Sequence, residues 1–344
     1  MELKKFTCPA CNSPLTAAED KMTCAACGNS FDKSAIEEFF AEEYTAEPAS
    51  EWAPREESIA EELRLPLYGC KGCGADFYAR EDKAPEVCPY CMGKLTICKE
   101  KVKLPRPDII VPFRQSKEDA QRALQKYLRT KPLLPQGYFS SAFDEMVGVY
   151  VPCVIADCTA EGKLRYDGVK KTVSRDSSKE SHFVLTRQGR ADFEGITVPV
   201  SLLSESIFSS LLPYDFHSND YDIKTLADYV TERVEADSSR DISRAERVAA
   251  DGFRKLISDT VSGYEPVTER SGVVDIKDGK TKLALVPLWI FRKKVKGKVY
   301  LFAMNAQSGK FFSSLPTSKG RAALLAVIIT AVTAIAGSVL SLLL

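Results

Sequence analysis

The sequence predicts an α+β protein that begins with two Cys₄ zinc ribbons and continues as a strand-rich domain. One C-terminal transmembrane helix is expected to follow. Three observations predict this class: eight of the eleven cysteines form Cys-x-x-Cys pairs, strand-like runs outnumber amphipathic helices, and the last 23 residues carry no charge. The expected boundaries are zinc ribbon 1 at 1–36, an acidic linker at 37–62, zinc ribbon 2 at 63–104, an α+β domain at 105–320 and a transmembrane segment at 321–344.

Two cysteine quartets begin the chain. The first contains Cys8, Cys11, Cys24 and Cys27, and the second contains Cys70, Cys73, Cys88 and Cys91. Twelve residues separate the pairs in the first quartet and fourteen in the second, which is typical of tetrahedral Cys₄ sites. Four thiolates leave no coordination position for water, so two structural Zn²⁺ ions are expected rather than hydrolytic centres. Iron in the same thiolate sites is the alternative metal.

The turns of these pairs and the redox state of the thiols can also be predicted. Gly28, Gly74 and Gly93 follow the pairs, and we expect them to supply the positive φ that a tight cysteine knuckle requires. A disulfide framework is the alternative to metal binding, and it would need an oxidising compartment. The chain begins MELKKFTCPA with no apolar signal segment, so reduced thiols are expected.

Charge is balanced over the whole chain, with 47 basic and 47 acidic residues, but it is unevenly distributed. Residues 37–62 contain ten glutamates against the single Arg55, a net charge of −9, and this predicts a flexible acidic linker between the ribbons. Residues 63–104 contain eight basic and five acidic residues, a net of +3. Weakly charged ribbons beside an acidic segment match DNA poorly, because phosphate neutralisation supplies most of such affinity.

The central region shows strand and helix patterns in sequence. Ser116 followed by Asp119 predicts a helix N-cap, and Lys131-Pro132 predicts the end of that helix. Further helices are expected at 222–236 and 241–262. Strands are expected at 148–157, 163–173, 181–188 and 193–203, with a strand-turn-strand unit at 283–315.

A short internal correspondence suggests two similar hairpins. Val151-Pro152, Ile155 and Gly162-Lys163 recur 135 residues later as Val286-Pro287, Ile290 and Gly297-Lys298. A repeat would make the domain pseudo-symmetric, with a Gly-Lys turn in each hairpin. Coincidence is the alternative, since both dipeptides are common at strand ends.

The uncharged segment Ala322–Leu344 predicts a membrane anchor. At about 1.5 Å per residue a helix of this length spans ~34 Å, which exceeds a hydrocarbon core of ~30 Å. A buried core helix is the alternative. With Lys310, Lys319 and Arg321 before the span, the expected location is the cell membrane, single-pass and tail-anchored, with the N-terminal bulk in the cytoplasm.

Several short motifs follow the two cysteine ribbons: Val111-Pro112-Phe113, Leu133-Leu134-Pro135, Gly148-Val149-Tyr150-Val151-Pro152, Leu212-Pro213-Tyr214, Leu285-Val286-Pro287-Leu288-Trp289 and Met304-Asn305-Ala306-Gln307-Ser308-Gly309-Lys310. Together with the ribbons they resemble a bacterial TFIIB-type zinc-ribbon family, whose members also carry a label borrowed from primosomal protein N-prime, a superfamily II helicase. In that family the last motif usually has Gly and Thr where this chain has Ala306 and Ser308. The resemblance covers most of the chain and implies little about activity.

Catalytic motifs are absent from the sequence, so no enzyme and no catalytic residue is predicted. Ser308-Gly309-Lys310 lacks the first glycine and the final hydroxyl of a phosphate loop and is expected to form a β-turn. His182 and His217 have no flanking nucleophile motif. Cys153 and Cys158 are expected in the core, and Cys98 as a spare thiol.

Three function hypotheses follow. The first is a non-enzymatic adaptor that binds a protein partner through its ribbons and brings it to the membrane. The second is a nucleic-acid-binding protein, suggested by the ribbons and by lysines among the aromatics from Trp289 to Phe312. The alternatives to nucleic-acid binding are that those lysines lie on a solvated strand face or contact lipid head groups. An enzyme is the third.

Overall fold

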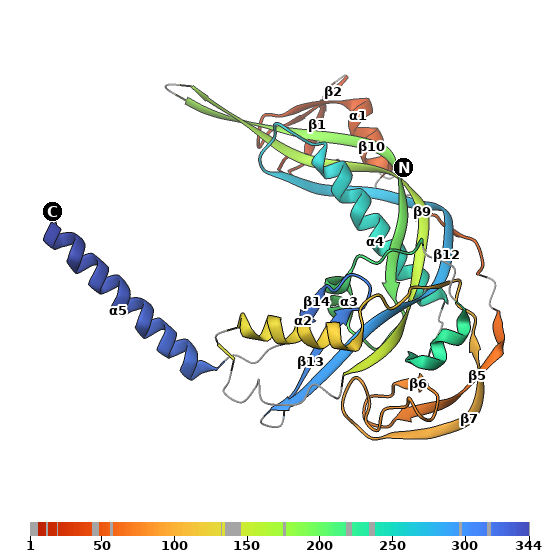
Figure 1. Ribbon diagram of the computed structural model, residues 1–344. Coiled ribbons are helices and arrows are strands. Elements are labelled where there is room, and N and C mark those ends of the chain that lie inside the picture. The colour runs from red at the N-terminus through yellow and green to blue at the C-terminus, as the bar shows by residue number, and fades with distance from the viewer. Residues whose placement is uncertain are drawn as a thin grey trace. The chain divides into compact units, whose positions relative to one another are not determined.

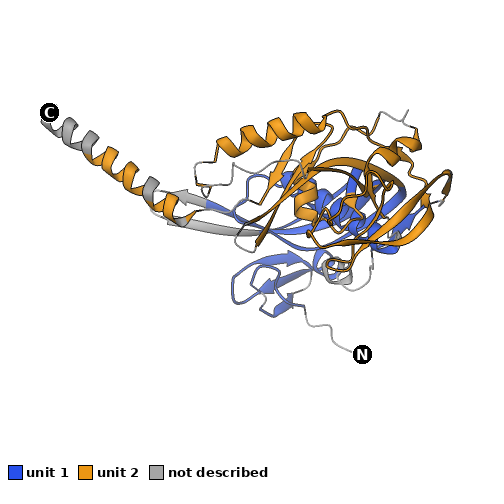
Figure 2. Cartoon of the chain, turned by 60° about the horizontal axis from the view of Figure 1, so that its bottom comes forward, with its two compact units in different colours: residues 1–55, 155–197, 237–281 blue, residues 56–154, 198–236, 282–344 orange. Residues whose placement is uncertain are grey.

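The computed structural model describes residues 6–11, 13–18, 20–42, 48–55, 58–131, 133–134, 146–174, 177–217, 222–233, 238–295, 298–314 and 318–343. They belong to two compact units (Figure 2). Unit 1 is built from residues 1–55, 155–197 and 237–281, and unit 2 from residues 56–154, 198–236 and 282–344. Three long strands contribute residues to both units: β9 (Val147–Ser174), β10 (Ser177–Pro199) and β12 (Val267–Val295).

Unit 1 begins with a small antiparallel sheet that carries the first cysteine quartet (Figure 1). Its strands are β1 (Leu15–Ala18), β2 (Lys21–Cys24) and β3 (Ser30–Asp32), in that order, and helix α1 (Lys33–Glu42) follows β3 directly. Within the described part of this module, the buried apolar side chains are Cys8, Met22, Cys24 and Ile36. A metal or a cross-link would add to the stability of this module.

Helix α4 (Ser238–Asp259) packs its apolar stripe against the long strands of unit 1. Ala245, Ala249 and Phe253 on this helix are fully buried. Gly162 on β9 lies where a Cβ atom would be 2.8 Å from the Phe253 ring and 2.6 Å from the Val273 carbonyl oxygen. This glycine therefore permits close packing inside a continuous strand.

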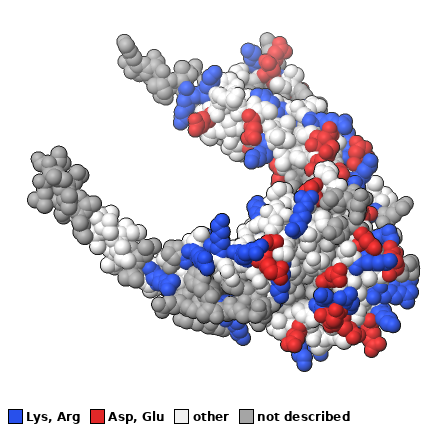
Figure 3. Space-filling model, in the orientation of Figure 1, with Lys and Arg blue, Asp and Glu red and all other residues white. Residues whose placement is uncertain are grey.

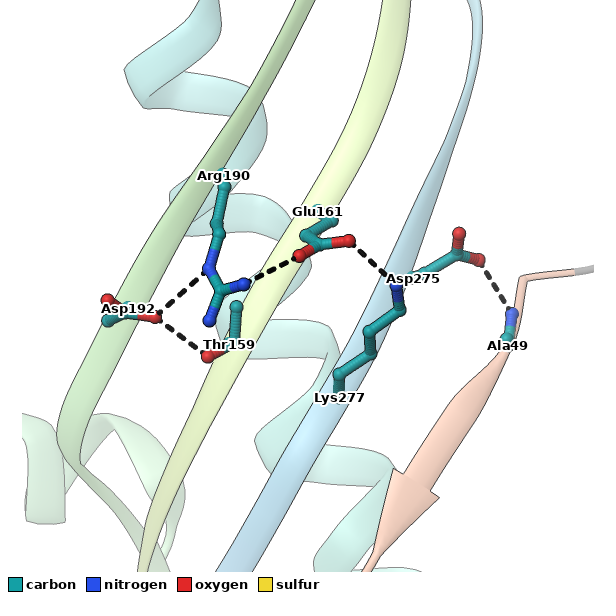
Figure 4. Close-up of polar contacts among 7 residues, drawn as sticks. All are labelled: Ala49, Thr159, Glu161, Arg190, Asp192, Asp275 and Lys277. Carbon is teal, nitrogen blue, oxygen red and sulfur yellow. Dashed lines mark hydrogen bonds and ion pairs between the residues drawn. The ribbon is translucent and has the colours of Figure 1, made fainter.

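Polar side chains connect the three long strands on the outside of unit 1 (Figure 4). Glu161 on β9 accepts hydrogen bonds from Lys277 on β12 at 2.7 Å and from Arg190 on β10 at 3.1 Å. Thr159 donates to Asp192 across the β9–β10 pair at 2.7 Å. The ammonium group of Lys277 lowers the pKa of Glu161, so this carboxylate is charged at neutral pH and bridges both neighbouring strands.

In unit 2, β11 and β13 pair with the parts of β9 and β12 that belong to this unit. The sheet has eleven strands, and its main path runs β14-β13-β12-β9-β11-β6-β5-β7. Strand β11 pairs parallel with β9 and antiparallel with β6. The bounds are β5 (Ile59–Cys70), β6 (Asp76–Tyr78), β7 (Leu95–Pro105), β8 (Ile109–Ile110), β11 (Val230–Glu232), β13 (Lys298–Asn305) and β14 (Phe311–Ser313).

Helix α2 (Lys117–Arg129) covers the β12–β13 hairpin. It begins at the expected cap, because the Ser116 hydroxyl accepts from the Asp119 amide and the Asp119 carboxylate accepts from the Ser116 amide. Its buried face packs in one apolar cluster with side chains of the hairpin. That cluster includes Ala120, Leu124, Leu128, Trp289, Phe291, Phe302 and Met304.

Two of the motifs that carry the family resemblance contact each other in unit 2. The buried Asn305 amide donates to the carbonyl oxygens of Leu211 at 2.9 Å and Pro213 at 3.1 Å. The Gln307 amide forms two bonds with the backbone of Asp215, and the Lys310 ammonium donates to the Leu212 carbonyl at 2.6 Å. The motifs therefore hold the segment after helix α3 (Glu205–Leu211) against the end of β13.

Several local expectations differ from the structure. The sequence predicts a helix over 222–236, but the described residues of this range, 222–233, form a short 3₁₀ helix (Ile223–Asp228) and then strand β11. The turn expected at Gly162-Lys163 is absent because β9 runs through it, and this removes the first of the two proposed similar hairpins. Residues 37–62, expected to be a flexible linker, contain the end of α1, strand β4 (Ser50–Trp52) paired with β12, and the start of β5.

The physical reason for the ordered segment at β4 is the Trp52 side chain. Its indole N–H donates to the Glu246 carboxylate at 2.9 Å. Its ring covers Gly279, where any Cβ would lie 2.4 Å from the ring. Trp52 therefore adds side-chain contacts to the backbone hydrogen bonds that join this glutamate-rich segment to β12.

The C-terminal segment forms one helix, α5 (Lys319–Leu343). The side chains of Val327, Ile328, Ile329 and Val332 on this helix are exposed. Over the described ranges of the chain, no helix meets the length and apolarity needed to cross a membrane. The transmembrane anchor expected at 321–344 stays a proposal.

The contact between the two motifs can be tested by Asn305→Ala. The substitution leaves the buried Leu211 carbonyl, the Pro213 carbonyl and the amides of Gln307 and Ser308 without their partner, so we expect a loss of roughly 2–3 kcal/mol in unfolding free energy. Urea denaturation followed by fluorescence measures it. The exposed Gln125→Ala is the matched control, and equal midpoints for both variants would contradict the assignment.

Candidate metal centres

The four sulfur atoms of each cysteine quartet converge to one point. In both quartets all four Sγ atoms lie within 4.8 Å of one another. Across the first site, the Sγ atoms of Cys8 and Cys27 are 3.6 Å apart, and those of Cys11 and Cys24 are 3.5 Å apart. The second site has the same spacing, 3.5 Å between Cys70 and Cys91 and 3.6 Å between Cys73 and Cys88.

These distances match a tetrahedral zinc–thiolate centre. With a Zn–S bond of about 2.3 Å, the edges of a regular tetrahedron of sulfurs measure about 3.8 Å. A disulfide would place two sulfurs about 2.05 Å apart, and all eleven cysteines are free thiols. Each quartet could therefore hold one metal ion, as the spacing predicted, and both geometries fit Zn²⁺.

A shared backbone pattern shapes all four knuckles. The first cysteine of each pair donates its amide N–H to the carbonyl five residues later: Cys8 to Ser13, Cys24 to Asn29, Cys70 to Ala75 and Cys88 to Gly93. Positive φ occurs at Gly28 and Gly74, as expected, with values of 74° and 79°. In the last knuckle the left-handed residue is Met92, with φ of 64°, and the expectation for Gly93 is wrong.

Gly93 has a packing role instead. A Cβ at this position would lie 3.2 Å from the Sγ atoms of both Cys70 and Cys91, which is tighter than most carbon contacts. Its amide also donates to the Cys91 sulfur at 3.4 Å, and the Tyr90 amide donates to the Cys88 sulfur at 3.3 Å. Such N–H···S bonds orient the thiolates and offset their negative charge.

The metal-free thiols of the first site differ in acidity. Burial raises the pKa of Cys8 to about 12, although the amides of Ala10 and Cys11 oppose the effect. Hydrogen bonds from the Ser13 side chain and backbone lower the pKa of the exposed Cys11 to about 6. The site therefore holds both thiol and thiolate at neutral pH, and a metal ion must displace protons to bind.

The second site is attached to unit 2 through Tyr90, which lies between the ligands Cys88 and Cys91. The Tyr90 hydroxyl donates to the buried Glu232 carboxylate at 2.6 Å. Burial, together with the Glu232 charge, raises the pKa of Tyr90 well above its ordinary value, so the hydroxyl keeps its proton. Glu232 also accepts from the Ser201 hydroxyl at 2.5 Å and from the Leu202 amide at 2.9 Å.

The first site has a comparable attachment within unit 1. Pro9, which lies between Cys8 and Cys11, presents its carbonyl oxygen to the Arg270 guanidinium on β12. The same guanidinium nitrogen lies 3.3 Å from Asp167 on β9. In both ribbons a Cys-Pro-x-Cys knuckle therefore contacts the protein's own long strands or their neighbours.

The opposite knuckles are exposed. In the first ribbon Ala25 and Ala26 are exposed between Cys24 and Cys27. In the second ribbon Lys71 and Gly72 are exposed between Cys70 and Cys73. Each candidate metal centre thus has one knuckle against its unit and one facing outward.

The remaining candidate residues take no part in these centres. Cys153 and Cys158 are buried as expected, and burial raises the pKa of both thiols. Cys98 is exposed. Ser308-Gly309-Lys310 forms the expected turn, in which the Gly309 amide donates to the Asn305 carbonyl at 2.8 Å. The His182 side chain lies outside the described residues, and His217 donates its backbone N–H to Asp215 at 3.1 Å.

The sequence did not reveal the attachments of the knuckles. An aromatic residue inside Cys-Pro-Tyr-Cys is a local signal, but its partner Glu232 is 142 positions away. Glu232 also lay in a segment expected to be helical, where it would have been a surface residue. In strand β11 its position between β9 and β6 buries it.

Comparison with known proteins finds similarity to "Uncharacterized protein YdjG" of Bacillus subtilis (strain 168). The two chains are 25% identical over 224 residues, which is 63% of this chain and 66% of that protein. The match therefore spans just under two thirds of the relative's length. No family model matches the chain, and no solved structure matches it significantly. The resemblance to the TFIIB-type family stays a prediction.

The attachment of the second site predicts the effect of Tyr90→Phe. The substitution leaves the buried Glu232 carboxylate with one hydrogen bond fewer, and we expect a loss of about 1–3 kcal/mol in unfolding free energy. Both zinc ions should remain bound, since the sulfur ligands are unchanged. Denaturation and metal analysis of the same sample measure both effects. Tyr264→Phe is the control, because the Tyr264 side chain is only half-buried. Loss of zinc without loss of stability in Tyr90→Phe would contradict the assignment.

The acidity of the thiols predicts how metal release depends on pH. Because the Cys8 pKa of about 12 keeps that thiol protonated without metal, binding releases a proton and weakens as pH falls. We expect zinc to leave the full-length protein below about pH 5.5. The first site should release its ion first, because Cys11 and Cys27 are exposed whereas Cys73 and Cys91 are partly covered. A chromogenic chelator measures the release, and zinc content that does not change down to about pH 4 would contradict the expectation.

Proposed function

We propose that this protein is a membrane-anchored zinc-ribbon adaptor that binds a protein partner and has no catalytic activity. The observation that carries the proposal is the arrangement of the two Cys₄ sites, each with one knuckle attached to its own unit and one exposed. Four-sulfur sites hold metal without an open position, so they support a fold or a recognition surface rather than hydrolysis.

The exposed knuckles are the proposed partner surfaces. Ala25 and Ala26 present small apolar side chains beside the first site, and Lys71 and Gly72 present a weakly basic surface beside the second. A metal-held turn is rigid before a partner arrives, so little conformational entropy is lost on binding. Such surfaces suit recognition of a folded protein or a short peptide.

The proposed anchor is helix α5. Ala322–Leu344 contains no charged residue, and the exposed fractions of Val327 and Val332 are 65% and 59%. Exposed β-branched apolar side chains on a helix are unfavourable in water and favourable in lipid. Lys310, Lys319 and Arg321 precede the segment, which supports a single-pass orientation with the preceding chain in the cytoplasm of a cell.

Nucleic-acid binding is the second candidate, and its support is weaker. Base stacking requires accessible aromatic faces. Within the hairpin, however, Trp289, Phe291 and Phe302 are buried against α2. The whole chain also carries no net charge to attract phosphate.

The anchor predicts the outcome of alkaline carbonate extraction. Full-length protein should stay in the membrane pellet, whereas Val327→Lys combined with Val332→Lys should move it to the supernatant. A lysine at the centre of a span costs about 2.5–3.5 kcal/mol on insertion scales, and Val332 lies near the centre of 322–344. Val248→Lys combined with Leu256→Lys, at two exposed apolar positions of α4, is the matched control. Extraction of the unmodified protein would contradict the anchor.

The adaptor surface predicts the result of crosslinking from membranes. Ala25→Arg combined with Ala26→Arg adds bulk to the exposed knuckle without touching a ligand, so zinc content should be unchanged while crosslinked protein partners are lost. Glu37→Arg combined with Glu51→Arg, at two exposed positions, provides the control. An unchanged set of partners in the knuckle variant would contradict an adaptor role for the first ribbon, and recovery of nucleic acid would favour the second candidate.

A further inference from the structure

Helix α2 carries its charges in a strongly polarised order. Glu118 and Asp119 occupy its first turn, and Lys126 and Arg129 its last. Lys131 follows, with its ammonium group 4.8 Å from the centre of the Tyr127 ring. Lys126 and Arg129 are exposed and form no ion pair with any carboxylate in the described ranges. The C-terminal end of α2 is therefore a cationic surface.

Helix α2 runs along the β12–β13 hairpin toward the turn between the two strands. At the start of α2, the Trp289 indole donates to the Gln115 carbonyl at 2.9 Å. Near its end, the Ser313 hydroxyl donates to the Tyr127 hydroxyl at 2.7 Å, and Ser313 pairs with Phe302. Trp289 pairs with Met304, which lies two residues farther from the hairpin turn than Phe302 does. Helix α2 therefore extends toward that turn.

The hairpin turn adds further cations to the same end of unit 2. Lys294 at the end of β12 and Lys298 at the start of β13 are both exposed. The favourable interaction of a helix dipole with basic residues accounts for Lys126 and Arg129. The dipole of α2 does not account for the hairpin lysines, because they lie on β12 and β13 and not on this helix.

The apolar helix α5 begins at this end as well. The Ser318 amide, directly before α5, donates to the Leu133 carbonyl at 2.8 Å, and Leu133 lies just beyond the end of α2. Arg321 occupies the first turn of α5. Figure 3 shows basic side chains gathered over α2, whereas charges of both signs mix over other parts of that face.

We infer that Lys126, Arg129, Lys131, Lys294, Lys298 and Arg321 form a docking surface for the anionic headgroups of the membrane into which α5 inserts. The inference rests on the proposed anchor. Clustered basic residues beside an apolar segment are attracted to acidic lipid, and the attraction fades within about 8–10 Å of the surface at physiological salt. Since the chain has no net charge, this attraction comes from the local cluster.

Docking gives the surface a positioning role. An anchor alone leaves a protein free to tilt about the point where its helix enters the membrane. Contacts from α2 and from the hairpin, which are separate elements, hold unit 2 in one orientation. Acidic lipid content would then decide how this unit faces the cytoplasm.

Lysine acetylation of the full-length protein in vesicles tests the surface. One vesicle preparation contains phosphatidylcholine alone, and the other contains phosphatidylcholine with phosphatidylserine. Mass spectrometry follows Lys126, Lys294 and Lys298, with the exposed Lys224 as an internal control. We expect acetylation of the three lysines to slow roughly threefold or more in the acidic vesicles and to recover in high salt. The rate at Lys224 should not change.

Charge variants supply the matched comparison. Lys126→Gln with Arg129→Gln should reduce the protection of Lys294, whereas Arg247→Gln with Lys255→Gln on the exposed side of α4 should not. Equal acetylation in both vesicle types, with the protein still floating with the vesicles, would overturn the docking surface and leave the anchor standing. Failure to float with either vesicle type would overturn both. Flotation only with acidic vesicles, reversed by salt, would keep the surface and overturn the anchor. Protection by added RNA or DNA but not by acidic lipid would also overturn the lipid surface.

Discussion

The convergence of four cysteine sulfurs at the second site is the constraint on which unit 2 depends most. Cys70 is the last residue of β5, and Cys88 and Cys91 lie just before β7, so the site closes the end of two paired strands of the large sheet. The same knuckle carries Tyr90, which supplies a hydrogen bond to the buried Glu232. A metal at this site would therefore hold a strand pair, a tyrosine and a buried carboxylate together.

The first site stands in a different structural context. Its small sheet buries few apolar side chains, and in the described part of the module these are two cysteines with Met22 and Ile36. The contact of Pro9 with Arg270 attaches it to long strands of unit 1 that are stabilised separately by α4. Loss of metal should then disturb a local module at the first site and part of the main sheet at the second. This difference makes the first ribbon the better candidate for exchanging partners, and the second a part of the scaffold.

The sequence predicted those features whose determinants lie close together along the chain. Cysteine spacing identified all eight candidate ligands, because two ligands of a knuckle need only a short turn to converge. The Ser116 cap predicted the start of α2 for the same reason. Segment 222–236 was mispredicted, because pairing of β11 with β9 and β6 outweighs its helical periodicity. Gly162 resembled a turn residue, and only the close approach of Phe253 and Val273 explains why the strand needs glycine there. The partners Glu232 and Arg270 come from distant segments and could not be predicted from one sequence.

Zinc K-edge X-ray absorption of the full-length protein, purified without added metal, tests the central claim most directly. The account predicts two zinc ions per chain, each with four sulfur ligands at about 2.3 Å and no oxygen or nitrogen neighbour. Two closed four-sulfur centres would establish the ribbons as structural metal sites rather than hydrolytic centres. A first shell containing oxygen or nitrogen, or a metal-free protein with sulfur–sulfur distances near 2.05 Å, would contradict the account.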